Sequence, residues 1–366
     1  MKVVVVGGGI LGASTAYHLA REGCEVTLVD RADEGRATAA GAGIVCPWGS
    51  PGEDAARYGL LANGARYYPE LAAMLAEDGE HDLGYAHVGG LYVPTDPGEL
   101  DAVEHRVRAR AADWPVGHYE RLSPAQACAL FPPLRPRQSA LFVSGGARVD
   151  GRRLTAALHR AGSRRRVRSV NGSAELVVQG GRALGVRVEG ELIEADTVIV
   201  AAGAWAPEML ETAGVALPVA PQRGQIIHLR LPGTDTTRWP VLMPLNNYYL
   251  LAFEDSRVVV GASRETNSGF DYRMTAAGVA EVLNAGLAVA PGLASWTLHE
   301  IRIGFRPLAV DDRPKLGPVP GLDNVLFGNG LGPSGLTMGP YCGRLLAEAA
   351  LGKPVDFTPY ALTSRA

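Results

Sequence analysis

The chain has 366 residues, of which 47% are hydrophobic and 20% charged, and its formal net charge is −3 at pH 7. This length and composition fit a medium-sized enzyme with a large core and two domains. The nearly balanced charge gives no reason to expect a nucleic acid or an anionic membrane surface as a partner, and no apolar run approaches the roughly 20 residues that span a bilayer.

Residues 2–12 read KVVVVGGGILG and predict a buried strand followed by a tight glycine turn. Gly7, Gly9 and Gly12 give this turn the spacing G-x-G-x-x-G. Glycines at this spacing let the backbone turn sharply and approach a pyrophosphate at the N-terminus of the next helix. The pattern predicts a dinucleotide site, although it also fits a glycine-rich turn of some other α/β protein.

The segment after the turn supports the dinucleotide interpretation. Residues 14–21 predict a helix with a small apolar face, and residues 25–29 predict a second strand. That strand ends in Asp30, 18 residues beyond Gly12. A carboxylate at about this spacing accepts the hydroxyls of an adenosine ribose and repels a 2′-phosphate, so NADP is disfavoured.

The middle of the chain alternates between irregular and regular segments. Residues 83–143 are rich in proline and glycine, with short strand-like pieces such as 90–93. Residues 196–205 predict a buried strand that ends in small residues, where a flat ligand can lie against the backbone. Between these two segments we expect a helix at 150–161 and strands at 174–178, 185–188 and 192–195.

A second irregular stretch covers residues 215–304. The elements expected there are strands at 224–231, 248–252 and 257–261 and a helix at 275–288. The chain then ends in a strand at 325–328, a glycine loop at 329–339 and a helix at 341–351. The pattern predicts an α/β protein with one domain at 1–82, 144–214 and 305–366 and another at 83–143 and 215–304.

Four motifs together carry a family resemblance: GGGILG with Asp30, VIVAAGAW at 198–205, PQRGQ at 221–225, and the block 304–317. They resemble the D-amino-acid oxidase and glycine oxidase family of flavoproteins, which includes D-amino-acid dehydrogenases. The last block is the most specific, because it matches the family pattern R-P-x-x-x-D-x-x-P-x-[IL]-G. The resemblance implies a Rossmann-like FAD-binding domain interleaved with an α+β substrate domain on an antiparallel sheet.

The family resemblance also implies an activity. The expected reaction is FAD-dependent oxidation of the Cα–N bond of a small amino acid, either a D-amino acid or glycine and its N-alkyl derivatives. A hydride passes from Cα to flavin N5, water hydrolyses the imine to a 2-oxo acid, and oxygen or another acceptor reoxidises the flavin. An NAD-dependent dehydrogenase and a non-catalytic dinucleotide-binding protein are the alternatives. The first would need a proton-shuttling residue, usually histidine, and none of the eight histidines lies in a recognisable motif.

Arg306 resembles the arginine that binds the substrate carboxylate in this family. A guanidinium offers two parallel donors that match a carboxylate. The alternative is that Arg306 pairs with Asp311 or Asp312 and only holds the segment together. Arg302, four residues earlier and outside the motif, is expected to be structural.

Tyr249 is the second expected catalytic residue, as a further donor to the carboxylate or as part of the pocket. Successive strand side chains point to opposite faces, so only one of Tyr248 and Tyr249 can face the site, and the family pattern selects Tyr249. The alternative is that both rings pack within a sheet. Arg264 and Arg223 border the same region, where each would either form a salt bridge or contact the substrate.

The glycine fingerprint and the resemblance together imply a set of cofactor-binding residues. They are Gly7, Gly9, Ile10, Leu11, Gly12, Asp30, Arg31, Ala42, Gly43, Ile44, Val170, Ala202, Gly203, Trp205, Gly332, Ser334, Gly335, Leu336 and Thr337. Leu331 stands where many relatives carry a histidine, which puts a polar side-chain role there in doubt.

Residues 39–48 are expected to lie along the flavin and contain no histidine, and Cys46 is expected to be a small buried thiol. Non-covalent FAD is therefore predicted, and no metal. The four cysteines are widely spaced, which is typical of reduced thiols in a cytoplasmic protein, and a homo-oligomer is left open.

Overall fold

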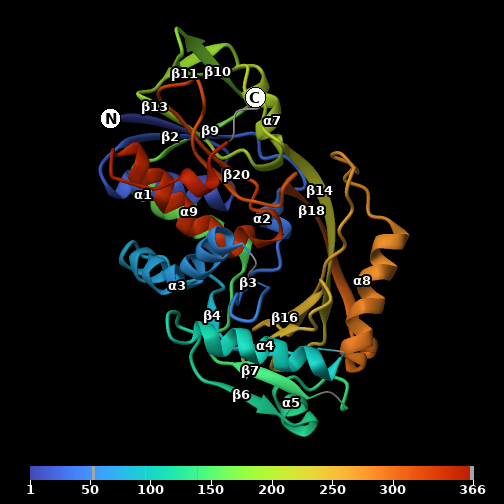
Figure 1. The fold of residues 1–366 in the computed structure, drawn as a ribbon. Coiled ribbons are helices and arrows are strands. Elements are labelled where there is room, and N and C mark those ends of the chain that lie inside the picture. The colour runs from blue at the N-terminus through green and yellow to red at the C-terminus, as the bar shows by residue number, and fades with distance from the viewer. Residues whose placement is uncertain (52–53, 95, 138, 363–366) are drawn as a thin grey trace.

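The structure is built around two large β-sheets, one toward each end of the molecule (Figure 1). This computed structural model describes residues 1–51, 54–94, 96–137 and 139–362. The long strands β14 (Val219–Arg230) and β18 (Thr297–Ala309) pair with each other and run along one side of the molecule. They therefore connect the two ends.

One sheet has six strands in the order β19-β20-β13-β1-β2-β9, and its pairs are parallel except for β19 with β20. Its strands are β1 (Lys2–Val6), β2 (Glu25–Asp30), β9 (Arg168–Asn171), β13 (Thr197–Val200), β19 (Lys315–Pro318) and β20 (Val325–Asn329). The four valines of β1 are buried, as expected for a strand covered on both faces.

Helices cover one face of the six-stranded sheet, and a smaller sheet covers the other. Val3 and Val5 pack with α1 (Ile10–Arg21) and α9 (Gly335–Ala350). Val4 and Val6 pack against α7 and a three-stranded sheet on the opposite side. The covering elements on that side are α7 (Ala206–Glu211), β10 (Ala174–Gln179), β11 (Arg182–Val188) and β12 (Glu191–Glu194).

The other large sheet has eight strands in the order β18-β14-β17-β16-β15-β5-β7-β6. Its pairs are antiparallel except for β15 with β5. Besides β14 and β18, its strands are β5 (Gly90–Tyr92), β6 (Tyr119–Leu122), β7 (Ala140–Val143), β15 (Val241–Met243), β16 (Tyr249–Phe253) and β17 (Arg257–Gly261). This sheet is the antiparallel platform that the family resemblance implies.

The remaining elements connect and cover these sheets. A small sheet contains β3 (Ile44–Val45), β4 (Ala86–His87) and β8 (Ala147–Arg148). The remaining helices are α2 (Ala37–Ala40), α3 (Ala55–Glu77), α4 (Pro97–Arg110), α5 (Pro124–Leu130), α6 (Gly151–Arg164) and α8 (Ala276–Val289). Short 3-10 turns lie at Gly203–Trp205, Pro291–Ser295, Gly332–Ser334 and Thr358–Tyr360. Within the described residues, no helix has the length and apolar content needed to cross a membrane.

Several elements differ from the sequence expectations. α1 begins at Ile10 rather than residue 14, and α9 begins at Gly335 rather than residue 341. The helices α3, α4 and α5 were not predicted. β18 is continuous across residues 304 and 305, so the domain boundary placed there is not a linker, and the expected domain bounds stay a prediction.

His18, on the buried face of α1, should make the free energy of unfolding fall as the pH drops below about 6.5. Burial lowers its pKa from 6.5 to about 4, so between these values the unfolded chain binds a proton that the folded chain does not. The stability contribution is therefore present above 6.5 and is lost as the pH falls toward 4. At pH 5 this costs about 2 kcal/mol.

Urea unfolding of the wild type and of His18→Gln at pH 7 and pH 5 measures this effect. Gln keeps hydrogen-bonding groups for Ser14 and Tyr67, the partners of the imidazole, but does not titrate. In the variant, the part of the fall in the free energy of unfolding between pH 7 and pH 5 that is due to His18 should be absent. An equal drop in both proteins would contradict the assignment.

Candidate active site

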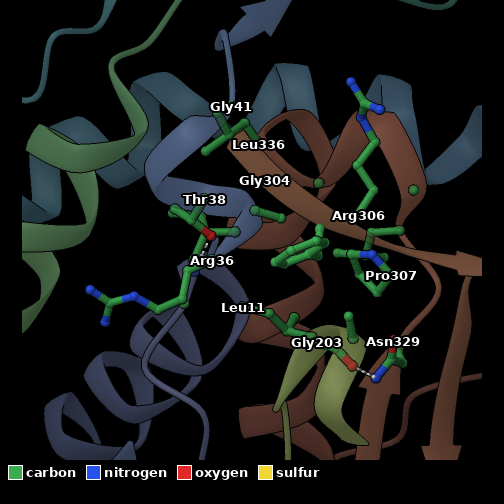
Figure 2. A pocket seen from close by; sticks show the side chains of 18 of the residues that line it. Leu11, Arg36, Thr38, Gly41, Gly203, Gly304, Arg306, Pro307, Asn329 and Leu336 are labelled. Carbon is green, nitrogen blue, oxygen red and sulfur yellow. Dashed lines mark hydrogen bonds between the residues drawn. The ribbon is translucent and has the colours of Figure 1, made fainter. Parts of the chain in front are cut away.

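A cavity of about 700 Å³ lies where the first turns of α1 and α9 approach β14, β16 and β18. Figure 2 shows part of its wall: Leu11, Gly203 and Asn329 lie together at one end of the view. There the Asn329 side-chain amide donates a hydrogen bond to the Gly203 carbonyl oxygen over 2.8 Å. Arg306 extends from β18 in the opposite direction. One cavity thus joins the glycine turn to the arginine of the most specific motif.

The glycine turn forms one end of the cavity. Gly7 and Gly9 line it, and α1 begins directly after Gly9, which has no side chain to cap the helix. The Thr38 hydroxyl accepts a hydrogen bond from the Ile10 N–H over 3.0 Å, while the N–H groups of Leu11 and Gly12 have no side-chain partner among the described residues. Such N–H groups have no partner within the helix and attract an anion. Gly7 has a φ of 106°, and a Cβ there would lie 2.4 Å from the Ala201 carbonyl oxygen, so the turn requires glycine. This geometry fits the pyrophosphate of a dinucleotide.

Asp30 lies at the end of β2, in the wall of the same cavity. Its carboxylate accepts hydrogen bonds from the backbone N–H groups of Gly8 and Ala32, and it lies 3.7 Å from Arg36 Nη1. A Cβ on Gly8 would lie 2.6 Å from this carboxylate, so the glycine leaves the space that Asp30 occupies. The carboxylate is held where an adenosine ribose is expected.

Most of the expected cofactor-binding residues line this cavity. Those in the wall are Gly7, Gly9, Ile10, Leu11, Asp30, Arg31, Ala42, Gly43, Ile44, Ala202, Gly203, Trp205, Gly332, Ser334, Gly335, Leu336 and Thr337. Gly12 and Val170 are not among the described lining residues. Gly12 instead lets α1 approach the turn, because a Cβ there would lie 1.8 Å from the Gly7 carbonyl oxygen. Val170 pairs with Val29 between β2 and β9, and its contact with a cofactor stays a prediction.

A second helix N-terminus borders the cavity at α9. The helix begins at Gly335, directly after the 3-10 turn Gly332–Ser334, and no side chain caps its first N–H groups. The Thr337 hydroxyl donates to the Ile44 carbonyl oxygen over 2.7 Å, which ties this helix to the segment expected along the flavin. Leu331 is buried in the wall and makes it apolar at this point. The polar groups that the chain offers at this point are therefore backbone N–H groups at a helix N-terminus, which attract negative charge, rather than the side chain of residue 331.

Cys46 lines the cavity but is a poor nucleophile. It is buried, and its Sγ lies 3.6 Å from the Tyr92 hydroxyl. Burial raises the pKa of the Cys46 thiol to about 12, so the reactive thiolate is scarce at neutral pH. All four cysteines of the chain are free.

Arg306 lies in the cavity wall, and β14 makes room for its guanidinium. A Cβ on Gly224 would lie 2.5 Å from Arg306 Nη2. Arg306 Nη1 donates to the Ser263 carbonyl oxygen over 3.0 Å and to Gln222 Oε1 over 3.4 Å. These are neutral acceptors, so the charge of the guanidinium is not compensated by them.

The alternative in which Arg306 pairs with Asp311 or Asp312 is not found among the described residues. Asp311 pairs with Lys315 over 2.5 Å, and Asp312 lies 4.0 Å from Arg57 Nη2. Arg302 pairs with Glu300 over 2.7 Å and does not belong to the described lining of the cavity, in keeping with a structural role.

Tyr249 lies beside Arg306. Its ring occupies the space over Gly261, where a Cβ would lie 2.6 Å from the Tyr249 hydroxyl oxygen. Burial raises the pKa of Tyr249, and the neighbouring Arg306 guanidinium opposes that rise. Tyr248 also lines the cavity, so the expectation that only one of the two tyrosines can do so is wrong: β16 begins at Tyr249, and Tyr248 lies before the alternating strand. The Tyr248 hydroxyl donates to Glu281 over 2.6 Å. Of the two hydroxyls, that of Tyr249 is the one placed beside the guanidinium.

Arg223 and Arg264, for which the sequence left two roles open, differ in their surroundings. Arg223 is buried and forms ion pairs with Glu265 over 2.6 Å and Asp271 over 2.9 Å. Arg264 lines the cavity beside Arg306 and has no ion pair among the described residues. The salt-bridge role thus falls to Arg223.

Arg57 is a cavity residue that the sequence reasoning missed. It lies in the first turn of α3, a helix that was not predicted. A signal was present: Asp54 precedes the helix and accepts a hydrogen bond from the Arg57 backbone N–H over 3.0 Å, as N-cap residues do.

Comparisons with known proteins agree with this geometry. The family model described as FAD dependent oxidoreductase (DAO) matches residues 2–349. The uncharacterized oxidoreductase YurR of Bacillus subtilis strain 168 is 45% identical over 98% of this chain and 97% of its own. Glycine oxidase of Pseudomonas aeruginosa is 31% identical over 100% of this chain and 99% of its own.

Among solved structures, iminodiacetate oxidase from Chelativorans sp. BNC1 is similar with a TM-score of 0.96 and 50% identity over 98% of both chains. Glycine oxidase from Geobacillus kaustophilus shares the fold, with a TM-score of 0.87 at 23% identity over 100% of this chain and 98% of its own. The fingerprint, the cavity and these matches lead to one conclusion: the chain is an enzyme that belongs to the DAO family of FAD-dependent oxidoreductases.

Proposed function

We propose that the enzyme oxidises the Cα–N bond of a small amino acid that carries its carboxylate on the oxidised carbon. N-substituted glycines and small D-amino acids are the expected class. The observation that supports this most directly is the Arg306 guanidinium, which lies in the cavity beside Tyr249 without an ion pair among the described residues. The relatives' names point the same way, because glycine and iminodiacetate both place a carboxylate one carbon from the nitrogen.

The residues of this chain would bind and orient the substrate. Bound FAD would supply the two-electron acceptor for the hydride that leaves Cα as the amine becomes an imine. Arg306 and Tyr249 hold the carboxylate and so fix the direction of the Cα–H bond. The first N–H groups of α9, whose start lines the cavity, would stabilise negative charge on the reduced cofactor. Water then hydrolyses the imine to a 2-oxo acid and ammonia or an amine.

FAD should be bound non-covalently. Residues 39–48 contain no histidine, and the Cys46 thiol that borders the cavity is held protonated by burial. Acid precipitation of the yellow holoenzyme should leave the colour in the supernatant and a protein mass equal to that of the bare chain. A yellow pellet with a mass increased by one flavin would overturn this expectation.

Anaerobic mixing of the FAD-loaded enzyme with glycine, sarcosine, D-alanine and L-alanine tests the proposed reaction. One or more of the first three should bleach the flavin absorbance, with release of a 2-oxo acid. Admitting oxygen afterwards separates an oxidase, which forms hydrogen peroxide, from a dehydrogenase, which needs another acceptor. If none of these amines, nor any N-substituted glycine or other small D-amino acid, reduces the bound flavin, the proposed function is wrong.

A further inference from the structure

The backbone around Arg264 is fixed so that its side chain faces the cavity. Ser263 and Glu265 flank it and form backbone hydrogen bonds with Gln225 and Arg223 of β14. Their side chains lie together on one face, where the Ser263 hydroxyl and the Gln225 amide donate to Glu265 Oε1 over 2.7 and 2.8 Å. Because consecutive side chains of an extended segment alternate, Arg264 lies on the other face, in the cavity wall.

The carboxylate next to Arg264 in sequence is not its partner. Glu265 is taken by Arg223, whose Nη2 and Nε lie 2.6 and 3.0 Å from Glu265 Oε2. Arg264 itself has neither a hydrogen bond nor an ion pair among the residues that the structure describes. Its guanidinium is therefore available to a ligand.

The cavity wall around Arg264 carries an excess of positive charge. Arg264 is an exposed residue of the cavity wall. Partial desolvation and then the neighbouring Arg306 guanidinium lower the pKa of Arg264, and Arg57 adds a further positive charge. Among the described groups, Asp312 is the carboxylate that opposes them, and it lies 4.0 Å from Arg57. Like charges that line one wall repel each other, and an anionic group bound between them removes that repulsion.

We propose that Arg264 binds a second, distal carboxylate of the substrate, and that the enzyme is selective for amines with two carboxylates. This inference rests on the proposed function, in which Arg306 and Tyr249 hold the first carboxylate. The positive charges of Arg306 and Arg264 both lower the pKa of Tyr249, so the tyrosine lies close to both guanidiniums. A secondary amine flanked by two carboxymethyl groups would put one carboxylate on each arginine and the nitrogen between them.

Sarcosine and iminodiacetate form a matched pair of probes, because both are N-substituted glycines and they differ by the distal carboxylate. In anaerobic flavin reduction, the wild-type enzyme should bind iminodiacetate more tightly than sarcosine. Arg264→Leu should weaken iminodiacetate binding by about 30-fold more than it weakens sarcosine binding, the size expected for one charge-assisted pair. Arg264→Lys, which keeps the charge, should recover part of the difference.

Binding without turnover gives a second readout. Diglycolate has an ether oxygen in place of the amine and cannot form an imine, and methoxyacetate is its monocarboxylate counterpart. Calorimetry should show that Arg264→Leu loses affinity for diglycolate and keeps its affinity for methoxyacetate. The matched control is Arg273→Leu, because Arg273 lies in the same loop with its side chain 85% exposed and outside the described lining of the cavity. This control should keep the wild-type preference, FAD content and thermal midpoint.

The outcomes separate this inference from the proposed function. If sarcosine or D-alanine reduces the flavin but iminodiacetate has no advantage, the amine oxidation stands and the second carboxylate site is wrong. Equal losses for both probes in Arg264→Leu would also overturn the site, since Arg264 would then serve the first carboxylate or the fold. If neither these two probes nor any other amino acid reduces the bound flavin, both proposals fail.

Discussion

Replacing Arg306 with leucine should raise the dissociation constant for the substrate by about 100-fold or more while the enzyme keeps its FAD. The change removes a charge-assisted pair with the carboxylate from a cavity that is partly shielded from water, which costs about 2–5 kcal/mol. Among the described residues, the Arg306 guanidinium donates to neutral acceptors of Ser263 and Gln222 and lies beside Tyr249, and it forms no ion pair that the fold would lose. Binding should therefore suffer far more than folding. Anaerobic titration of the flavin absorbance gives the dissociation constant, and the flavin-to-protein ratio reports the bound cofactor.

Arg230→Leu is the matched control for this experiment. Arg230 ends β14 in the same sheet and donates to the Asp255 carbonyl oxygen over 3.0 Å, but it is not part of the described cavity wall. Tyr249→Phe provides an intermediate case, because it removes one hydroxyl donor and should cost about 10-fold in affinity. A dissociation constant of Arg306→Leu within threefold of wild type would rule out Arg306 as the carboxylate anchor.

Gly7→Ala should abolish FAD binding and yield a colourless protein of reduced stability. The left-handed backbone at Gly7 costs an L-residue about 1–2 kcal/mol. The added Cβ would also lie 2.4 Å from the Ala201 carbonyl oxygen and 2.8 Å from Ala202 Cα, atoms that belong to the cavity wall. Relief of this clash must move the end of β1 away from the segment after β13. The turn beneath the expected pyrophosphate is then lost, which absorbance at flavin wavelengths and thermal unfolding would measure.

Two other glycines separate the causes of this effect. Gly23 has a φ of 81°, but no atom of the described residues lies within 4 Å of an added Cβ, so Gly23→Ala tests backbone strain alone and should keep FAD. Gly59 lies inside α3, and no described atom lies within 4 Å of an added Cβ, so Gly59→Ala should be neutral or stabilising by up to about 1 kcal/mol. Yellow, stable Gly7→Ala protein would show that the turn does not carry the cofactor site.

The parts of the fold that sequence reasoning predicted are those in which local pattern and tertiary environment agree. The valines of β1 read as a buried strand because both faces of that strand are covered. Asp30 could be placed by its spacing from the glycine turn, since strand and helix lengths fix that distance along the chain. The same holds for β17, whose bounds match the expectation of residues 257–261.

The long helix α3, which sequence reasoning missed, contains residues that oppose a helix locally. α3 includes Gly64 and Pro69, and a Cβ on Gly64 would lie 2.3 Å from the Thr337 carbonyl oxygen of α9. The glycine is present because two helices approach closely there. Its local cost, about 1 kcal/mol relative to alanine, is recovered in packing.

α9 was expected to begin too late for the same reason. Pro340 lacks the N–H that would bond to the Leu336 carbonyl oxygen, which reads as a helix break. In the structure, the Tyr68 hydroxyl donates to that carbonyl, and the Ser14 hydroxyl donates to the Pro340 carbonyl oxygen over 2.8 Å. Side chains from α3 and α1 thus supply partners that the sequence around Pro340 does not reveal.

By itself, the sequence predicted a dinucleotide site and an α/β architecture, because both depend on short motifs with fixed local geometry. The family resemblance added FAD as the cofactor and Arg306 as the arginine expected to hold a carboxylate. Only the tertiary structure decided which charges are left for a ligand. The sequence alone does not distinguish Arg223 from Arg264. In the structure, Glu265 and Asp271 neutralise Arg223, whereas Arg264 lines the cavity beside Arg306. Which arginine forms an ion pair depends on contacts between segments distant along the chain. It also depends on the alternation of side chains in the extended segment 263–265, which lies beside β14. The charge of the substrate site is therefore a property of the folded protein.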